Sequence, residues 1–277
     1  MRALFLIPGD SSLQLQAFPA VGAVADQLQA QVQIVCPPEA VPLWGLHPGV
    51  SRAVPFNFEA GTLADWANLL GTIREPDFQL CINRAGGRQV DLMLSMSHIP
   101  SRIASGGFSA TERVKEPQGI WPCQAWEAWL QPIGVRLEAE VFRLTLPPAE
   151  LRQAAAELPS GDGPVLLLAP AGGEGDWPQE RWQELPGLIR RSLPNLRTLA
   201  GGTGTIREQA ARMANADVVL ASDPASIELA VLLGLPVVAL GRASSALPSR
   251  QGVQALGRAG QLDGLTSAEV LSALGLA

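Results

Sequence analysis

Three polar residues follow the first apolar run of the chain and are its first candidates for chemistry. The run covers residues 3–7 and ends in a Pro-Gly pair, after which come Asp10, Ser11 and Ser12. Ligands of parallel α/β sheets bind at the carboxyl ends of the strands, where such residues lie. A carboxylate there can act as general base if it lies within hydrogen-bond reach of the reacting hydroxyl. Asp10 is therefore the candidate catalytic residue, with Ser11 and Ser12 as ligand-binding residues, and a turn-forming Asp10 is the alternative.

A glycine-rich turn in the second half of the chain is a candidate anion site. Ala171, Gly172 and Gly173 stand between an apolar run and a segment of helical period. Backbone N–H groups in such a turn can point at a phosphate. We expect these residues to bind a ligand, although the carboxylates of Glu174 and Asp176 oppose an anion.

The start of a later helix offers a second such site. Asp223 and Ser226 flank this start, with Pro224 at its first position. We expect both residues to contact a ligand, and an N-cap role for Asp223 is the alternative. A weaker phosphate site is the glycine-rich loop 201–204, which is alternatively a turn before a helix capped by Thr205.

Metal binding is not indicated. The chain has two histidines, His47 and His98, and three widely spaced cysteines without a CxxC pair. Both histidines are expected to be structural, and the cysteines to be small core residues in a reducing compartment. We therefore expect no metal and no cofactor.

Charge and hydropathy limit the partners and the location. The 277 residues carry 20 basic and 26 acidic side chains, and Lys115 is the only lysine. Without a basic run, no nucleic-acid partner is expected. No apolar run reaches the length of about 18 residues that a transmembrane segment needs. The chain is predicted to be cytoplasmic, and peripheral membrane contact stays open.

Short apolar runs alternate with segments of helical period, which predicts an α/β fold of parallel sheets covered on both faces. Strands are expected over 3–7, 32–36, 53–58, 78–83, 102–104, 165–169, 217–222 and 236–241. Helices are expected over 13–30, 63–75, 87–98, 123–134, 149–158, 178–192, 205–215 and 225–234, with a last helix starting at Thr266. Turn and linker residues divide the pattern into two Rossmann-like domains, 1–148 and 164–277, joined by a linker over 149–163.

Segments in both halves resemble, in order, glycosyltransferase family 9, the heptosyltransferases. They are FPAV at 18–21, HPGVSRAVPF at 47–56, PDFQLCIN at 76–83, SRIASG at 101–106, LLLAPAGGEGDWPQERWQEL at 166–185 and NADVVLASDPASIELAVLLGLPVVALG at 215–241. The resemblance implies a GT-B fold, with an acceptor-side domain and a donor-side domain whose sheets face a cleft. It also implies metal-independent transfer of a sugar from a nucleotide-diphosphate donor to a glycan or lipid-linked acceptor.

The sequence departs from this family where the resemblance implies chemistry. The base of the family lies in an S-S-x-G-D turn, and an ungapped alignment places Leu13 at that aspartate, three residues after Asp10. The phosphate-binding lysine that precedes the Trp-Pro pair is Gly175 here. Arg181 and Arg207 are candidates to replace its charge.

Two more departures affect the donor side. The D-S-G-P-x-H signature of the family reads D-P-A-S-I-E from Asp223, so that Glu228 stands in place of the histidine. A strand–helix unit that supplies an acidic residue to the nucleotide has no counterpart before residue 201. The second domain is therefore expected to be shortened by about one βα unit.

Two functions are consistent with this sequence. Four departures in one direction favour a catalytically degenerate family-9-like protein that acts as a binding or assembly factor. The alternative is an active glycosyltransferase that uses Asp10 as base. Trp121, Trp126 and Trp129 are dense for one short segment, which indicates either packing between domains or an exposed anchor for a protein partner.

Overall fold

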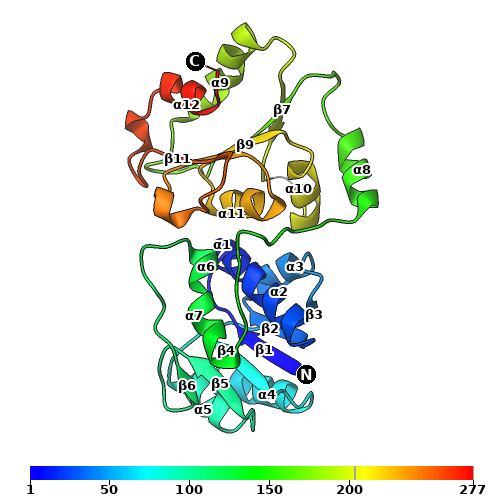
Figure 1. Ribbon diagram of the computed structural model, residues 1–277, viewed down its shortest axis with the longest axis vertical. Helices are drawn as coiled ribbons and strands as arrows, with labels where there is room; N and C mark the ends of the chain where they lie inside the picture. Colours follow the sequence, from blue (N-terminus) through cyan, green and yellow to red (C-terminus); the bar gives the residue numbers. More distant parts are fainter. Residues whose placement is uncertain (203, 277) are drawn as a thin grey trace. The chain divides into compact units, whose positions relative to one another are not determined.

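The computed structural model describes residues 1–202 and 204–276. The chain divides into two units, Met1–Phe142 and Arg143–Ala277. In each unit, helices lie on both sides of one central sheet (Figure 1). The α/β class and the two Rossmann-like domains predicted from the sequence are confirmed.

Unit 1 is built on a parallel sheet with the order β3-β2-β1-β4-β5-β6. Its strands are β1 (Arg2–Leu6), β2 (Gln31–Cys36), β3 (Val50–Pro55), β4 (Leu80–Asn83), β5 (Ser101–Ala104) and β6 (Glu112–Arg113). Its helices are α1 (Ser11–Gln16), α2 (Phe18–Gln27), η1 (Pro38–Ala40), α3 (Val41–Trp44), α4 (Leu63–Arg74), α5 (Arg88–Ser95), α6 (Pro122–Ala125), α7 (Glu127–Leu130) and η2 (Gln131–Ile133).

The central strands of unit 1 are apolar throughout because both of their faces are covered. Leu4 and Leu6 of β1 pack into a core with side chains of α4 and α5. Phe5, which points to the opposite face by the alternation of a strand, contacts the Trp126 ring at 6.2 Å between centroids. Burial on two faces explains why β1 has no alternating pattern.

Unit 2 has a parallel sheet with the order β11-β10-β9-β7-β8. Its strands are β7 (Val165–Ala169), β8 (Arg197–Ala200), β9 (Val218–Ala221), β10 (Val237–Leu240) and β11 (Val253–Leu256). Its helices are α8 (Pro148–Ala156), α9 (Gln179–Ser192), α10 (Ile206–Met213), α11 (Pro224–Leu233), η3 (Ser244–Ala246), η4 (Leu262–Gly264) and α12 (Ser267–Ala273).

The two sheets differ at one edge. Numbered along each unit, the first follows the Rossmann order 3-2-1-4-5-6 and the second follows the order 2-1-3-4-5. Within the described part of unit 2, no strand lies beyond β8, whereas unit 1 has β3 beyond β2. The omitted βα unit remains a prediction, and it would belong at the β8 edge.

The change of unit comes earlier than the predicted domain end at residue 148. The Leu144 N–H donates to the Leu232 carbonyl at 2.8 Å, so the chain already lies against α11 at that point. The predicted linker 149–163 also begins inside unit 2. Its helix α8 is tied to α10 by a 2.7 Å ion pair between Glu150 and Arg207.

Proline and capping residues decide where helices begin. The helix expected over 13–30 is two helices, α1 and α2, because Pro19 has no N–H with which to continue α1. The capping boxes expected at Thr205 and Thr266 are both present.

The expectation of buried thiols is also confirmed, since Cys36, Cys81 and Cys123 are free and buried.

His47 has a structural role, as predicted. Its side chain is 3% exposed. Nδ1 accepts from the Gly49 N–H at 3.0 Å, which leaves Nε2 to donate to the Phe18 carbonyl at 3.0 Å. Burial lowers the pKa of His47 to about 4, which the backbone hydrogen bond to Phe18 partly opposes. The folded chain therefore holds a neutral imidazole.

This burial predicts a pH dependence of stability. An unfolded chain protonates His47 near pH 6.5 and the folded chain near pH 4, so stability is full above pH 6.5 and is lost as the pH falls through this window. At about 1.4 kcal/mol per pH unit, the loss reaches about 3 kcal/mol. The free energy of unfolding, determined in urea at pH 7, 6 and 5, measures this loss of stability. His47→Gln keeps a donor and an acceptor but does not titrate, so it should flatten the slope. An equal slope in both proteins would contradict this assignment.

Gly163, directly before β7, predicts a second stability effect. A Cβ built there overlaps the Asn195 carbonyl oxygen, a backbone atom that cannot move aside cheaply. We expect Gly163→Ala to destabilise the chain by about 1–3 kcal/mol, as overpacking does. Gly187→Ala is the matched control, because no atom lies within 4 Å of its Cβ position in α9. That change should stabilise the chain by about 0.5–1 kcal/mol. Equal midpoints of the three proteins in thermal unfolding would disprove the clash.

Candidate functional site

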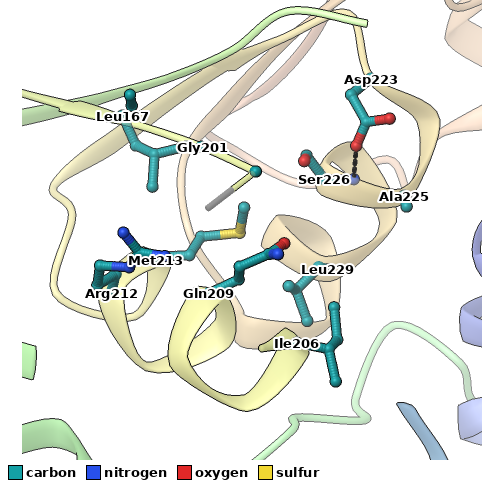
Figure 2. Close-up of a pocket in the computed structure, with 12 residues that line it drawn as sticks. Leu167, Gly201, Ile206, Gln209, Arg212, Met213, Asp223, Ala225, Ser226 and Leu229 are labelled. Atoms are coloured by element: carbon teal, nitrogen blue, oxygen red, sulfur yellow. Dashed lines mark hydrogen bonds between the residues drawn. The ribbon is translucent and has the colours of Figure 1, made fainter. Parts of the chain in front are cut away.

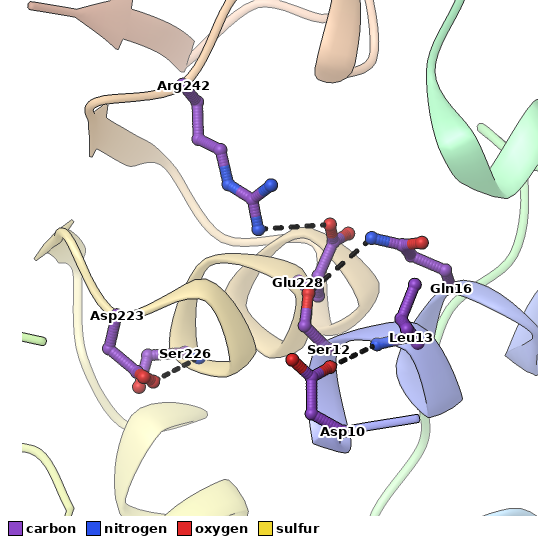
Figure 3. A network of polar contacts seen from close by, with 8 residues as sticks. All are labelled: Asp10, Ser12, Leu13, Gln16, Asp223, Ser226, Glu228 and Arg242. Atoms are coloured by element: carbon purple, nitrogen blue, oxygen red, sulfur yellow. Dashed lines mark hydrogen bonds and ion pairs between the residues drawn. The ribbon is translucent and has the colours of Figure 1, made fainter. Parts of the chain in front are cut away.

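Asp10 lies in unit 1, beyond the carboxyl end of β1, and caps α1. Its Oδ1 accepts from the Leu13 N–H at 3.0 Å (Figure 3). Ser11 starts α1 and is half-buried, and Ser12 is buried with its Oγ 3.5 Å from Gln16 Nε2. The predicted base and its two neighbours thus form one helix start, in which one carboxylate oxygen holds the backbone.

The predicted anion loop of unit 2 is held by side chains of the same unit. The Ala171 N–H donates to Ser222 Oγ at 2.8 Å, and the Gly172 N–H donates to Asp176 Oδ2 at 2.7 Å. The other oxygen of Asp176 accepts from the Trp177 N–H at 2.7 Å. Two N–H groups that were expected to face a ligand therefore already have acceptors, and one acceptor is a carboxylate.

The start of α11 shows the same arrangement. Asp223 is the N-cap, and its Oδ2 accepts from the Ser226 N–H at 2.7 Å (Figure 3). Pro224 at the next position has no N–H to offer. The capping role, which the sequence left open beside a functional one, is present in the structure.

These two segments line one cavity of about 250 Å³ at the carboxyl ends of β7, β9 and β10. Glu174 and Asp176 contribute carboxylates to its lining, and Arg242 contributes a guanidinium. The cavity brings Ala171 and Gly172 together with Ser222 and Pro224. The polar groups of the cavity thus carry charges of both signs, with the acidic ones on the glycine-rich loop.

Arg242 is a functional candidate that the sequence reasoning missed. It follows β10 and Gly241, so that it lies, like Asp10, beyond the carboxyl end of a strand. Its Nη2 lies 3.7 Å from Oε1 of Glu228, whose side chain is 1% exposed (Figure 3). Glu228, which stands where the resemblance implies a histidine, therefore forms an ion pair with the guanidinium that lines the cavity.

The two arginines expected to supply a phosphate-binding charge, Arg181 and Arg207, have partners elsewhere in unit 2. Arg181 donates to the carbonyls of Asp263 and Leu265, which fixes the chain before α12. Arg207 forms the ion pair with Glu150 on α8. Neither is among the lining residues of the 250 Å³ cavity.

A smaller cavity of about 40 Å³ lies between the starts of α10 and α11 (Figure 2). Gly201, Gln209, Arg212 and Ser226 are among its lining residues. This volume admits about three water molecules. The predicted phosphate loop 201–204 contributes Gly201 and Gly202 to the cavity, whereas Thr203 lies outside the described residues.

The tryptophans of residues 121–129 are buried. Trp121, Trp126 and Trp129 are 6%, 1% and 2% exposed. The interpretation of these rings as an exposed aromatic anchor is therefore wrong; the Trp126 ring packs against those of Trp129 and Phe5.

In residues 1–202 and 204–276, no group of three or more His, Cys, Asp or Glu side chains is arranged to hold a metal ion. No helix in the same residues has the length and apolar character needed to cross a bilayer.

No protein-family model matches the chain, and no curated protein matches it significantly. Solved structures do match over nearly the full length. The E. coli ADP-heptose LPS heptosyltransferase II has a TM-score of 0.78 at 17% identity, over 99% of this chain and 98% of that one. A family 9 glycosyltransferase from Veillonella parvula has a TM-score of 0.81 at 13% identity, over 99% and 96%.

The E. coli heptosyltransferase WaaC with ADP-2-deoxy-2-fluoro heptose has a TM-score of 0.75 at 14% identity, over 99% of both chains. At such identities the likeness concerns the fold. The chain has the fold of the glycosyltransferase family 9 heptosyltransferases, the GT-B type with two Rossmann-like domains.

Proposed function

We propose that this chain is a catalytically degenerate protein of the heptosyltransferase fold that acts as a binding or assembly factor. The observation that carries the proposal is the hydrogen bond from the Gly172 N–H to Asp176 Oδ2. A carboxylate of the chain itself takes the place that a donor phosphate would need on this loop.

The charges around the loop support the same conclusion. Glu174 and Asp176 flank Gly175, which stands where the resemblance implies a lysine. A nucleotide diphosphate bound there would face two like charges in place of one opposite charge. At about 4 Å each such pair amounts to about 1 kcal/mol in water and about 4 kcal/mol at an effective dielectric constant of 20. The change therefore reduces donor affinity by several factors of ten.

The alternative, an active transferase, rests on Arg242. This guanidinium lines the 250 Å³ cavity and is a suitable partner for a phosphate. The ion pair between Arg242 and Glu228 argues against this alternative, because it would have to break before a phosphate could bind Arg242. Asp10 would serve as the base, in addition to capping α1.

A thermal-shift panel of nucleotide diphosphates and their sugar conjugates tests the proposal. We expect no shift for the native chain. For the double variant Glu174→Gln/Asp176→Asn, we expect binding of at least one nucleotide diphosphate, with an affinity gain of about tenfold per removed carboxylate. Saturation at 100 times the dissociation constant adds about 2.7 kcal/mol, which corresponds to several degrees for a chain of this length.

The control is Glu184→Gln, which removes one negative charge from an exposed position on α9 outside the cavity. It should leave the panel flat. A clear shift of the native chain with one sugar nucleotide, together with sugar transfer that Asp10→Asn abolishes, would establish the active alternative and overturn the proposal.

A further inference from the structure

Arg84 has an unusual environment in unit 1, apart from the donor-side cavity. It is the first residue after β4, beside β1, and the chain leaves these two strands toward opposite edges of the sheet. Ligands of open α/β sheets bind at the carboxyl ends of such a pair. The topology thus places this arginine where a ligand site is expected.

Tryptophan rings form the surface on which Arg84 lies. The guanidinium carbon is 4.8 Å from the ring centroid of Trp126 and 5.4 Å from that of Trp129. A cation over an indole face is held by the ring quadrupole. The side chain is therefore kept in one orientation, with a quarter of it exposed.

Indole N–H groups that have no acceptor in the described part of the chain occur in the segment that supplies the two rings under this arginine. The indole N–H groups of Trp121, Trp126 and Trp129 are buried and have no acceptor among the described residues. Buried indole N–H groups normally have one. Burial also lowers the pKa of Arg84, and the carboxylate of Glu116 counteracts this. The environment favours an additional oxyanion.

The chain itself supplies an anionic contact to Arg84. Glu116 Oε2 lies 2.9 Å from Arg84 Nη2, and the Glu116 side chain is about as exposed as that of Arg84. It belongs to residues 114–121, which have neither helix nor strand. Such a solvent-accessible ion pair contributes little to stability, so another oxyanion can replace it.

The turn after Arg84 leaves room for a ligand. No atom lies within 4 Å of the Cβ positions of Gly86 and Gly87, both of which have positive φ. Gly87 is the N-cap of α5, and no side chain caps this helix. The exposed Arg88 follows, so the turn carries a second positive charge.

We propose that Arg84 anchors a binding site for an oxyanion, a carboxylate or phosphate group of a ligand, and that Glu116 occupies this anchor when the ligand is absent. Binding breaks the Arg84–Glu116 ion pair, releases Glu116 to solvent and forms a new contact with the forked guanidinium. All residues of the site belong to unit 1, so the proposal does not depend on the donor-side cavity of unit 2.

Titrations with inorganic phosphate and, separately, with malonate test the site through tryptophan fluorescence at constant ionic strength. The native chain should bind weakly, and Glu116→Gln should lower the dissociation constant at least tenfold, because the internal competitor is removed. The anion that binds more tightly, phosphate or malonate, identifies the ligand group as a phosphate or a carboxylate. Arg84→Gln should abolish the signal, and Arg84→Lys should weaken it, because it keeps the charge without the fork.

Glu112→Gln is the matched control, an equal loss of charge at an exposed position of β6 in the same connection. It should change the dissociation constant less than twofold. An equal gain in Glu112→Gln and Glu116→Gln, or no saturable binding of either anion by Glu116→Gln, would overturn the proposal. Because Arg84→Gln can also disturb packing, ¹⁵N-indole resonances of Trp126 and Trp129 in Glu116→Gln give a second measure: both should shift with the anion, and unchanged resonances would count against the site.

Discussion

Two parallel sheets whose central strands are buried on both faces constrain everything else in this chain. Strands such as β1 and β7 have no solvent side, so each needs helices on both faces and long crossovers to its neighbours. The crossovers place all loops that follow strands at the carboxyl edge of their sheet. Asp10, Arg84, the glycine-rich loop at 171–173 and Arg242 all lie after strands for this one reason.

At these edges the chain satisfies its own polar groups. Asp10 caps α1, Asp223 caps α11, and Asp176 holds Gly172. A helix start or a glycine-rich turn needs acceptors for its N–H groups, and in a ligand-binding protein part of that need is left to the ligand. Here carboxylates of the chain itself accept from these N–H groups in both units.

Three arginines of the described residues form ion pairs with glutamates. Glu150 pairs with Arg207, Glu228 with Arg242 and Glu116 with Arg84. The pairs differ in how easily they open. The Glu228 side chain is 1% exposed and has no route to solvent, whereas the Glu116 side chain is 27% exposed and can turn to solvent. This difference separates an arginine held in place by the core from one available for exchange.

The sequence by itself determined the α/β class, the two domains, most strands and the caps at Thr205 and Thr266, because apolar runs, helical period and capping boxes are local patterns. It also named Asp10, the loop at 171–173 and Asp223, since residues after strands can be read from the chain order. Tertiary structure alone decided which acceptor each N–H group binds and that Trp126 is buried. It also decided that Arg242 lines the cavity, whereas Arg181 and Arg207 do not. These outcomes depend on contacts between residues far apart in the chain, such as Ala171 with Ser222, which no local pattern contains.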